Sequence, residues 1–140
     1  MKVTPYLEFK GNATEAIELY TKAFDAKLTY TLHYRDDADT LKKYPNDKDK
    51  IMHATLELEK DKAHLYLADS YPDTNYIAGN NMLVHVQLET IEKLDYVFNT
   101  LKEGGDINTE LNDTFWDSRF GAVTDRFGTR WSLHYQYPEK

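Results

Sequence analysis

The stretch from Phe115 to Leu133 reads FWDSRFGAVTDRFGTRWSL and is the most informative part of the sequence. Its pattern predicts a strand, a tight turn and a second strand. The turn falls at Asp125-Arg126-Phe127-Gly128, because an Asp side chain accepts hydrogen bonds from its own backbone and Gly adopts the positive φ that a Cβ resists. Trp, Phe and Arg side chains surround this turn. That mixture predicts one wall of a binding site.

The stretch belongs to the second of two halves of the chain that share one order of elements. In each half this order is a strand, a helix and three further strands. In the first half these elements are expected at residues 3–9, 13–24, 28–34, 51–59 and 63–69. Asn12 is expected to cap the first helix, with Glu15 completing a capping box. In the second half the strands are expected at 82–88, 106–112, 115–124 and 130–136, and the helix between Thr90 and Gly104. Residues 70–81 connect the halves.

The repeated order predicts an α+β fold of two βαβββ modules that form a curved mixed sheet with a central cleft. We expect a single domain over residues 1–140, with one module at about 1–70 and the other at about 81–140. A helix covers one face of each sheet in this arrangement, and the other face stays free to bind a ligand.

Composition narrows the class of protein. The chain has 140 residues and a net charge of −7, which disfavours nucleic acid as a partner because phosphate backbones attract Lys and Arg. No apolar run approaches the ~20 residues of a membrane span. The sequence has no Cys, which excludes disulfides and thiolate chemistry. These features predict a cytoplasmic protein with no membrane partner.

Several motifs resemble those of one family. They are Pro5 to Asn12 followed by Glu15-Ala16, His53 to Leu56, Leu65 to Ser70, and the stretch from Phe115 to Leu133. Together they resemble PhnB-like proteins of the vicinal oxygen chelate superfamily, which includes glyoxalase I, bleomycin-resistance proteins and extradiol dioxygenases. The resemblance implies the glyoxalase/bleomycin-resistance fold and a homodimer. It also brings the label 3-demethylubiquinone 3-methyltransferase, although the chain has no glycine-rich turn that would hold a methyl donor.

The resemblance also implies where a metal would be bound. Metal-dependent members place ligands at four positions, which correspond here to Pro5 or Tyr6, Tyr66 or Leu67, Leu83, and Ser132. None of these residues is His or Glu, so the sequence predicts no metal and no other cofactor. A shifted metal site made of three histidines is the alternative.

Eight residues are candidates for a ligand-binding cleft: His53, Tyr66, His85, Trp116, Arg119, Phe120, Arg130 and Ser132. Side chains alternate along a strand, so His85 shares a side with Leu83, and Arg130 shares a side with Ser132 and His134. The same rule places Trp116 and Phe120 on one side of their strand and Arg119 on the other. The alternative is structural: histidines bonded within the sheet near a dimer seam, and aromatic side chains packed under the helices.

Two further features allow two interpretations each. The charged segment 35–50 is expected to be a solvated loop, with or without a helical turn, or a mobile lid in which Tyr44 covers a ligand. Glu8 and Glu57 are expected either to be solvated or, if buried, to act as a general base.

The sequence therefore predicts a PhnB-like, glyoxalase/bleomycin-resistance-type protein that binds a small planar or anionic molecule in a metal-free cleft. The alternatives are a metal-dependent lyase, isomerase or dioxygenase of the same superfamily, and last the methyltransferase of the family label. The expected partners are this small-molecule ligand and a second copy of the chain.

Overall fold

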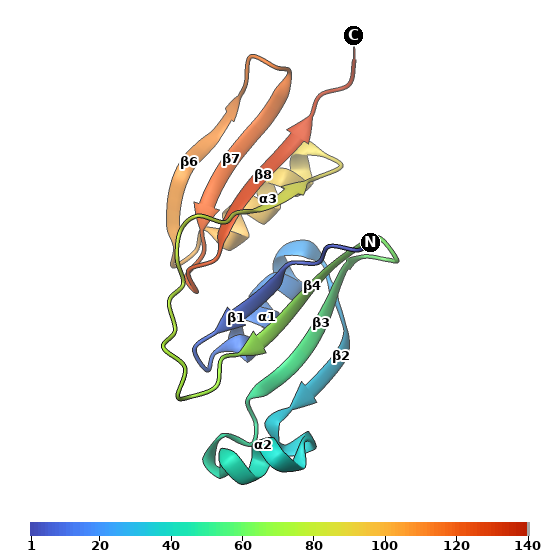
Figure 1. The fold of residues 1–140 in the computed structure, drawn as a ribbon. Coiled ribbons are helices and arrows are strands. Elements are labelled where there is room, and N and C mark those ends of the chain that lie inside the picture. Colours follow the sequence, from blue (N-terminus) through green and yellow to red (C-terminus); the bar gives the residue numbers. More distant parts are fainter. Residues whose placement is uncertain (140) are drawn as a thin grey trace. The chain divides into compact units, whose positions relative to one another are not determined.

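Two four-stranded mixed sheets, each with one long helix, make up the computed structural model, which describes residues 1–139 (Figure 1). The chain divides into two units, Met1–Ile77 and Ala78–Lys140. The boundary falls in the connector between the two sheets.

The first unit contains β1 (Tyr6–Phe9), α1 (Ala13–Phe24), β2 (Lys27–His33), β3 (Ile51–Glu59) and β4 (Ala63–Asp69). The strand order in its sheet is β1-β4-β3-β2. β1 and β4 are parallel, and the other neighbours are antiparallel. Between β2 and β3 the chain forms a 3-10 turn (Tyr34–Asp36), the short helix α2 (Ala38–Lys43) and a second 3-10 turn (Pro45–Asp47). The charged segment therefore contains a helix rather than a plain loop.

The second unit contains β5 (Val84–Gln87), α3 (Ile91–Leu101), β6 (Asp106–Asp113), β7 (Ser118–Thr124) and β8 (Arg130–Gln136). The strand order is β5-β8-β7-β6, and β5 is parallel to β8. This topology repeats that of the first unit, so the predicted pair of βαβββ modules is confirmed. Three expected strands are shorter than predicted: β1 begins at Tyr6, β5 covers Val84–Gln87, and β7 begins at Ser118 and not at Phe115.

Helix α1 packs its apolar side on one face of the first sheet, as Figure 1 shows. The buried residues Ala16, Ile17 and Tyr20 recur at helical spacing, and α1 contacts β3 and β4, whose Leu56 and Leu67 are also buried. Asn12 is the N-cap residue of α1 as predicted, but its side chain makes no hydrogen bond to the helix. The carboxylate of Asp69 takes that role, accepting a bond from the Ala13 N–H at 2.9 Å.

Helix α3 covers the second sheet in the same way. Its buried residues Leu94, Val97, Phe98 and Leu101 face β7 and β8. The predicted cap is confirmed here, because the Thr90 side chain accepts a bond from the Lys93 N–H at 3.1 Å.

The turn from Asp125 to Gly128 is also confirmed. The Asp125 Oδ1 accepts bonds from the N–H groups of Phe127 and Thr129 at 2.9 and 3.1 Å. Its Oδ2 accepts a bond from the Trp131 indole at 2.9 Å. Gly128 has a φ of 90°, which a residue with a Cβ rarely adopts. One buried carboxylate thus holds the turn and orients the largest side chain of the core.

Among residues 1–139, no helix is long and apolar enough to cross a membrane.

Candidate functional site

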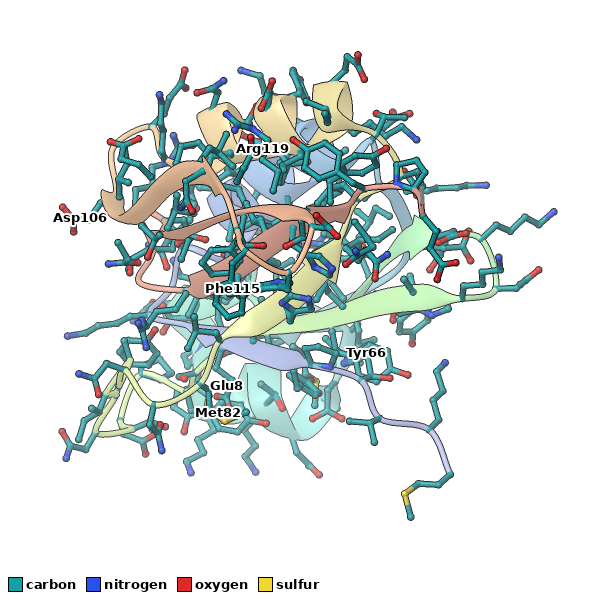
Figure 2. The ribbon with its side chains drawn as sticks, turned by 90° about the horizontal axis from the view of Figure 1, so that it is seen from above. Glu8, Tyr66, Met82, Asp106, Phe115 and Arg119 are labelled. Atoms are coloured by element: carbon teal, nitrogen blue, oxygen red, sulfur yellow. The ribbon has the colours of Figure 1, made fainter. Side chains whose placement is uncertain are left out.

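The face of the first sheet opposite α1 carries a group of aromatic side chains, which we call the aromatic face. Side chains alternate along each strand, so burial of Leu65 and Leu67 under α1 turns Tyr66 to the other side. The same alternation turns His53 and Thr55 away from the buried Ala54 and Leu56, as predicted. The aromatic face consists of Tyr6, Glu8, Tyr30, His53, Thr55 and Tyr66. Figure 2 labels Glu8 and Tyr66 among its side chains.

His53 lies at the centre of the aromatic face. Its ring centroid is 4.9 Å from that of Tyr66, 5.4 Å from that of Tyr6 and 6.1 Å from that of Tyr30. Register explains this gathering, because Tyr6 pairs with Tyr66 across β1 and β4, and Tyr66 pairs with Thr55 across β4 and β3. The sequence predicted His53 and Tyr66 as candidates but missed Tyr6 and Tyr30 as their partners.

A chain of hydrogen bonds links three of these side chains. The Tyr6 hydroxyl lies 2.8 Å from His53 Nδ1, and His53 Nε2 lies 3.2 Å from the Thr55 hydroxyl. Burial, and after it the nearby Glu8 carboxylate, raises the pKa of Tyr6 above its usual 10.0. Tyr6 therefore keeps its hydroxyl proton at neutral pH, and this hydroxyl donates to His53 Nδ1 or accepts from it according to the tautomer of His53. This series of hydrogen bonds can be extended to an oxygen or nitrogen atom of a ligand, either at the Tyr6 hydroxyl or at the Thr55 hydroxyl.

A pocket of about 240 Å³ lies at the Tyr6 and Glu8 end of the aromatic face, and we call it the face pocket; His53 and Tyr66 lie outside its lining. Its lining includes Tyr6 and Glu8 of β1, Met52 of β3, and Tyr71 and Thr74 of the connector. Ligand pockets for drug-sized molecules span roughly 300–1,000 Å³, so this one suits a single small ring system.

A second pocket of about 270 Å³, the edge pocket, lies where β1 and β4 end. Its lining includes Lys10, Lys50, Tyr71, Thr74 and Tyr76. Tyr71 and Thr74 line both pockets. The sequence analysis missed both residues, because the connector has no periodic pattern that would place its side chains.

Tyr71 also joins the α2 segment to the connector. Its ring stacks on Tyr44 with centroids 5.3 Å apart and planes 14° apart, and it lies 5.6 Å from the Tyr34 ring. The Tyr44 hydroxyl donates to the Asp73 carboxylate at 2.8 Å. Tyr44 thus contacts a residue that lines both pockets, and its role as a lid stays a prediction.

In the second unit, His85, Phe120, Arg130 and Ser132 lie on the sheet face opposite α3. Register pairs His85 with Ser132, and His85 Nδ1 lies 2.9 Å from the Ser132 hydroxyl. The burial of Trp131 and Leu133 turns Ser132 and Arg130 to this face, as the alternation predicted. His134 stacks on His85 with ring centroids 4.7 Å apart.

The lowered pKa of His134 leads us to expect that the stability of the protein depends on pH. Burial, and then the neighbouring His85, lowers the pKa of His134 below its ordinary 6.5. The unfolded chain then binds a proton at His134 more readily than the folded chain does. We expect this contribution to stability to be complete above pH 6.5 and lost as the pH falls through the lower folded pKa. Urea unfolding over this range should show a shallower pH slope in His134→Gln; an equal slope in both proteins would contradict the assignment.

Arg119 and Trp116 lie apart from these groups. Arg119 is on the other side of β7 from Phe120, as predicted, and its guanidinium is 3.5 Å from the Asp113 carboxylate. Trp116 does not share a strand face with Phe120, because it lies in the turn before β7. Hydrogen bonds between Thr114 and Ser118 close this turn. Phe115, labelled with Arg119 in Figure 2, is 94% exposed there and contacts Trp116 edge to face.

Metal-ligating side chains do not converge within the described part of the chain: no three His, Asp or Glu residues there are grouped as a metal site would require. The predicted alternative of a three-histidine site has no counterpart in residues 1–139, where His85 is grouped with one other histidine.

The fold of this chain has a counterpart among solved structures. A glyoxalase/bleomycin resistance protein/dioxygenase from Nocardioides is 17% identical and superposes with a TM-score of 0.56, covering 100% of this chain and 87% of the other, which shows the fold alone. The two repeated βαβββ units therefore give this chain the glyoxalase/bleomycin-resistance fold.

The family is shown by closer comparisons. The model of the family described as 3-demethylubiquinone-9 3-methyltransferase matches residues 1–134. Protein PA1353 from Pseudomonas aeruginosa is 32% identical with a TM-score of 0.84, over 97% of this chain and 98% of the other. A PhnB protein from Bacillus cereus, described as a putative 3-demethylubiquinone-9 3-methyltransferase, is 29% identical with a TM-score of 0.78, over 96% of this chain and 99% of the other. The chain belongs to this PhnB-like family.

Proposed function

We propose that this PhnB-like protein binds a small planar or anionic molecule on the aromatic face of its first unit. The observation that supports this most strongly is the clustering of His53, Tyr6 and Tyr66 around a hydrogen-bonded hydroxyl. Aromatic rings offer large rigid surfaces for stacking, and a phenol or imidazole adds directional bonds. His53 and Tyr66 were candidates from the sequence, and Tyr6 completes the group.

The test uses 2-naphthamide as a neutral planar probe, with binding followed by amide chemical shifts in NMR. We expect shifts concentrated in β1, β3 and β4. Tyr66→Ala should weaken binding about three- to tenfold, because a ring contact of this kind is worth ~0.5–1.5 kcal/mol.

Tyr96→Ala is the matched control, since Tyr96 is an exposed tyrosine of α3 in the second unit. It should leave the affinity unchanged. Equal affinities of the two variants, or shifts spread without preference for β1, β3 and β4, would rule out the aromatic face as the site.

We also propose that the protein is a homodimer. The large apolar side chains Tyr30, Leu28 and Phe115 are all more than 40% exposed, and pairing with a second copy would cover such area. Light scattering coupled to size exclusion should then give about twice the chain mass of 16.4 kDa. A mass equal to one chain would refute the proposal.

Two enzymatic functions are the alternatives. The adjacent His85 and His134 favour a metal-dependent lyase, isomerase or dioxygenase, and a stoichiometric divalent ion in purified protein that is lost in His85→Gln would support it. The description of the matching family favours a methyltransferase. Thermal stabilisation by S-adenosylmethionine would support that function, because a ligand that binds only the folded state raises its stability.

A further inference from the structure

Two lysines, Lys10 and Lys50, line the edge pocket at the end of the first sheet. Lys10 directly follows β1, and Lys50 directly precedes β3. Ser70 follows β4 and is held beside β1 by a bond from its N–H to the Phe9 carbonyl at 2.8 Å. The parallel ends of β1 and β4 thus fix the frame of this pocket.

Lys50 has a fixed position. Its ammonium donates to the Gly11 carbonyl at 2.8 Å. Gly11 has a φ of +83°, and a Cβ added there would lie 3.2 Å from Lys50 Nζ, so glycine leaves room for the ammonium. An ammonium has three N–H donors, and this bond uses one of them. Two donors stay available to a ligand.

The charge balance of the edge pocket favours an anion. Within residues 1–139, neither Lys10 nor Lys50 has a carboxylate within 4.0 Å of its ammonium. The Glu8 carboxylate nearby accepts a bond from the Ser70 hydroxyl at 2.8 Å. Asp47 also lines the pocket and offsets one of the two positive charges. Among the side chains that line the pocket, two lysines against one aspartate leave one net positive charge, with Glu8 outside the lining, in a chain whose net charge is −7.

The edge pocket adjoins the face pocket, because Tyr71 and Thr74 line both. We propose that the edge pocket binds the acidic group of the ligand, a carboxylate or a phosphate ester, at Lys10 and Lys50, and that its planar part lies in the face pocket. This inference rests on the proposed function and defines the ligand as a planar acid. The Thr74 hydroxyl, at the junction, can donate to the same group.

The test compares 2-naphthoate and 2-naphthyl phosphate with the neutral 2-naphthamide, again by NMR titration. We expect the acids to bind at least tenfold more tightly than the amide. Lys50→Gln and Lys10→Gln should each weaken binding of the acids about tenfold and leave 2-naphthamide unchanged, because a charge-assisted hydrogen bond is lost.

Lys60→Gln is the matched control, since Lys60 is exposed in the turn between β3 and β4. Lys50→Arg keeps the positive charge that Lys50→Gln removes, so it should retain most of the affinity for 2-naphthoate and 2-naphthyl phosphate. Lys10 is exposed, so Lys10→Gln tests the site even if Lys50→Gln disturbs the Gly11 contact. Whichever of 2-naphthoate and 2-naphthyl phosphate binds more tightly shows whether the edge pocket prefers a carboxylate or a phosphate ester.

The outcomes separate the two proposals. If 2-naphthamide binds and the acids bind no more tightly, or if both lysine variants behave like Lys60→Gln, the anion site is refuted and the aromatic face stands. If none of the three probes shifts β1, β3 or β4, both proposals fail.

Discussion

Replacing Asp69 with Ala is expected to lower the free energy of unfolding of the first unit by about 4 kcal/mol. Asp69 is 6% exposed, and its two carboxylate oxygens accept bonds from the N–H groups of Ala13 and Ile51 at 2.9 and 2.8 Å. The variant leaves both buried donors unpaired, and each costs roughly 1–3 kcal/mol. The start of α1 and the start of β3 should therefore loosen together.

Urea unfolding measures this loss, and amide hydrogen exchange at Ala13 and Ile51 localises it. Asp39→Ala, an exposed position in the first turn of α2, is the control and should cost less than about 1 kcal/mol. If Asp69→Ala and Asp39→Ala had equal costs, the carboxylate would not join these elements as described.

The second large effect is expected in the other unit, where Asp125→Ala should cost about 3 kcal/mol. The Asp125 carboxylate accepts three bonds, from the N–H groups of Phe127 and Thr129 and from the Trp131 indole. Trp131 is fully buried, so its indole N–H would lose its partner in the core. Asp125→Asn should cost less, because an amide oxygen keeps part of this acceptor capacity.

Chemical unfolding gives the cost, and the indole N–H resonance of Trp131 reports the lost bond. Asp106→Ala, at the exposed start of β6, is the matched control. A Trp131 resonance that is unchanged in Asp125→Ala would show that the bond does not hold the ring.

The elements could be predicted where their pattern is local. Helix α1 occupies 13–24 as predicted, and β3 and β4 occupy 51–59 and 63–69 as predicted, because helical spacing and alternation are properties of adjacent residues. The turn at Asp125 was predicted for the same reason. Alternation also placed His53 and Ser132 on the free faces, and their function stays a prediction.

Features that depend on distant residues could not be predicted. Asn12 had the right type and position for a cap, yet Asp69, 56 positions after Ala13, provides the bond. The sequence alone does not show which strand end reaches the start of a helix. The pocket residues Tyr71 and Thr74 were missed for the same reason, since their placement depends on where the connector leaves β4.

The pairing of β1 with β4, the first and last strands of the first unit, affects when this unit can fold during synthesis. β1 pairs with β4, so Tyr6 reaches its neighbour only when Tyr66 has been made. A ribosome that has released the chain as far as β3 therefore exposes β1 with no neighbouring strand. Closing a segment of this length delays folding, since distant contacts form late. We expect that nascent chains that have emerged from the ribosome only as far as Glu59 are far more sensitive to protease at β1 than chains that have emerged beyond Ser70.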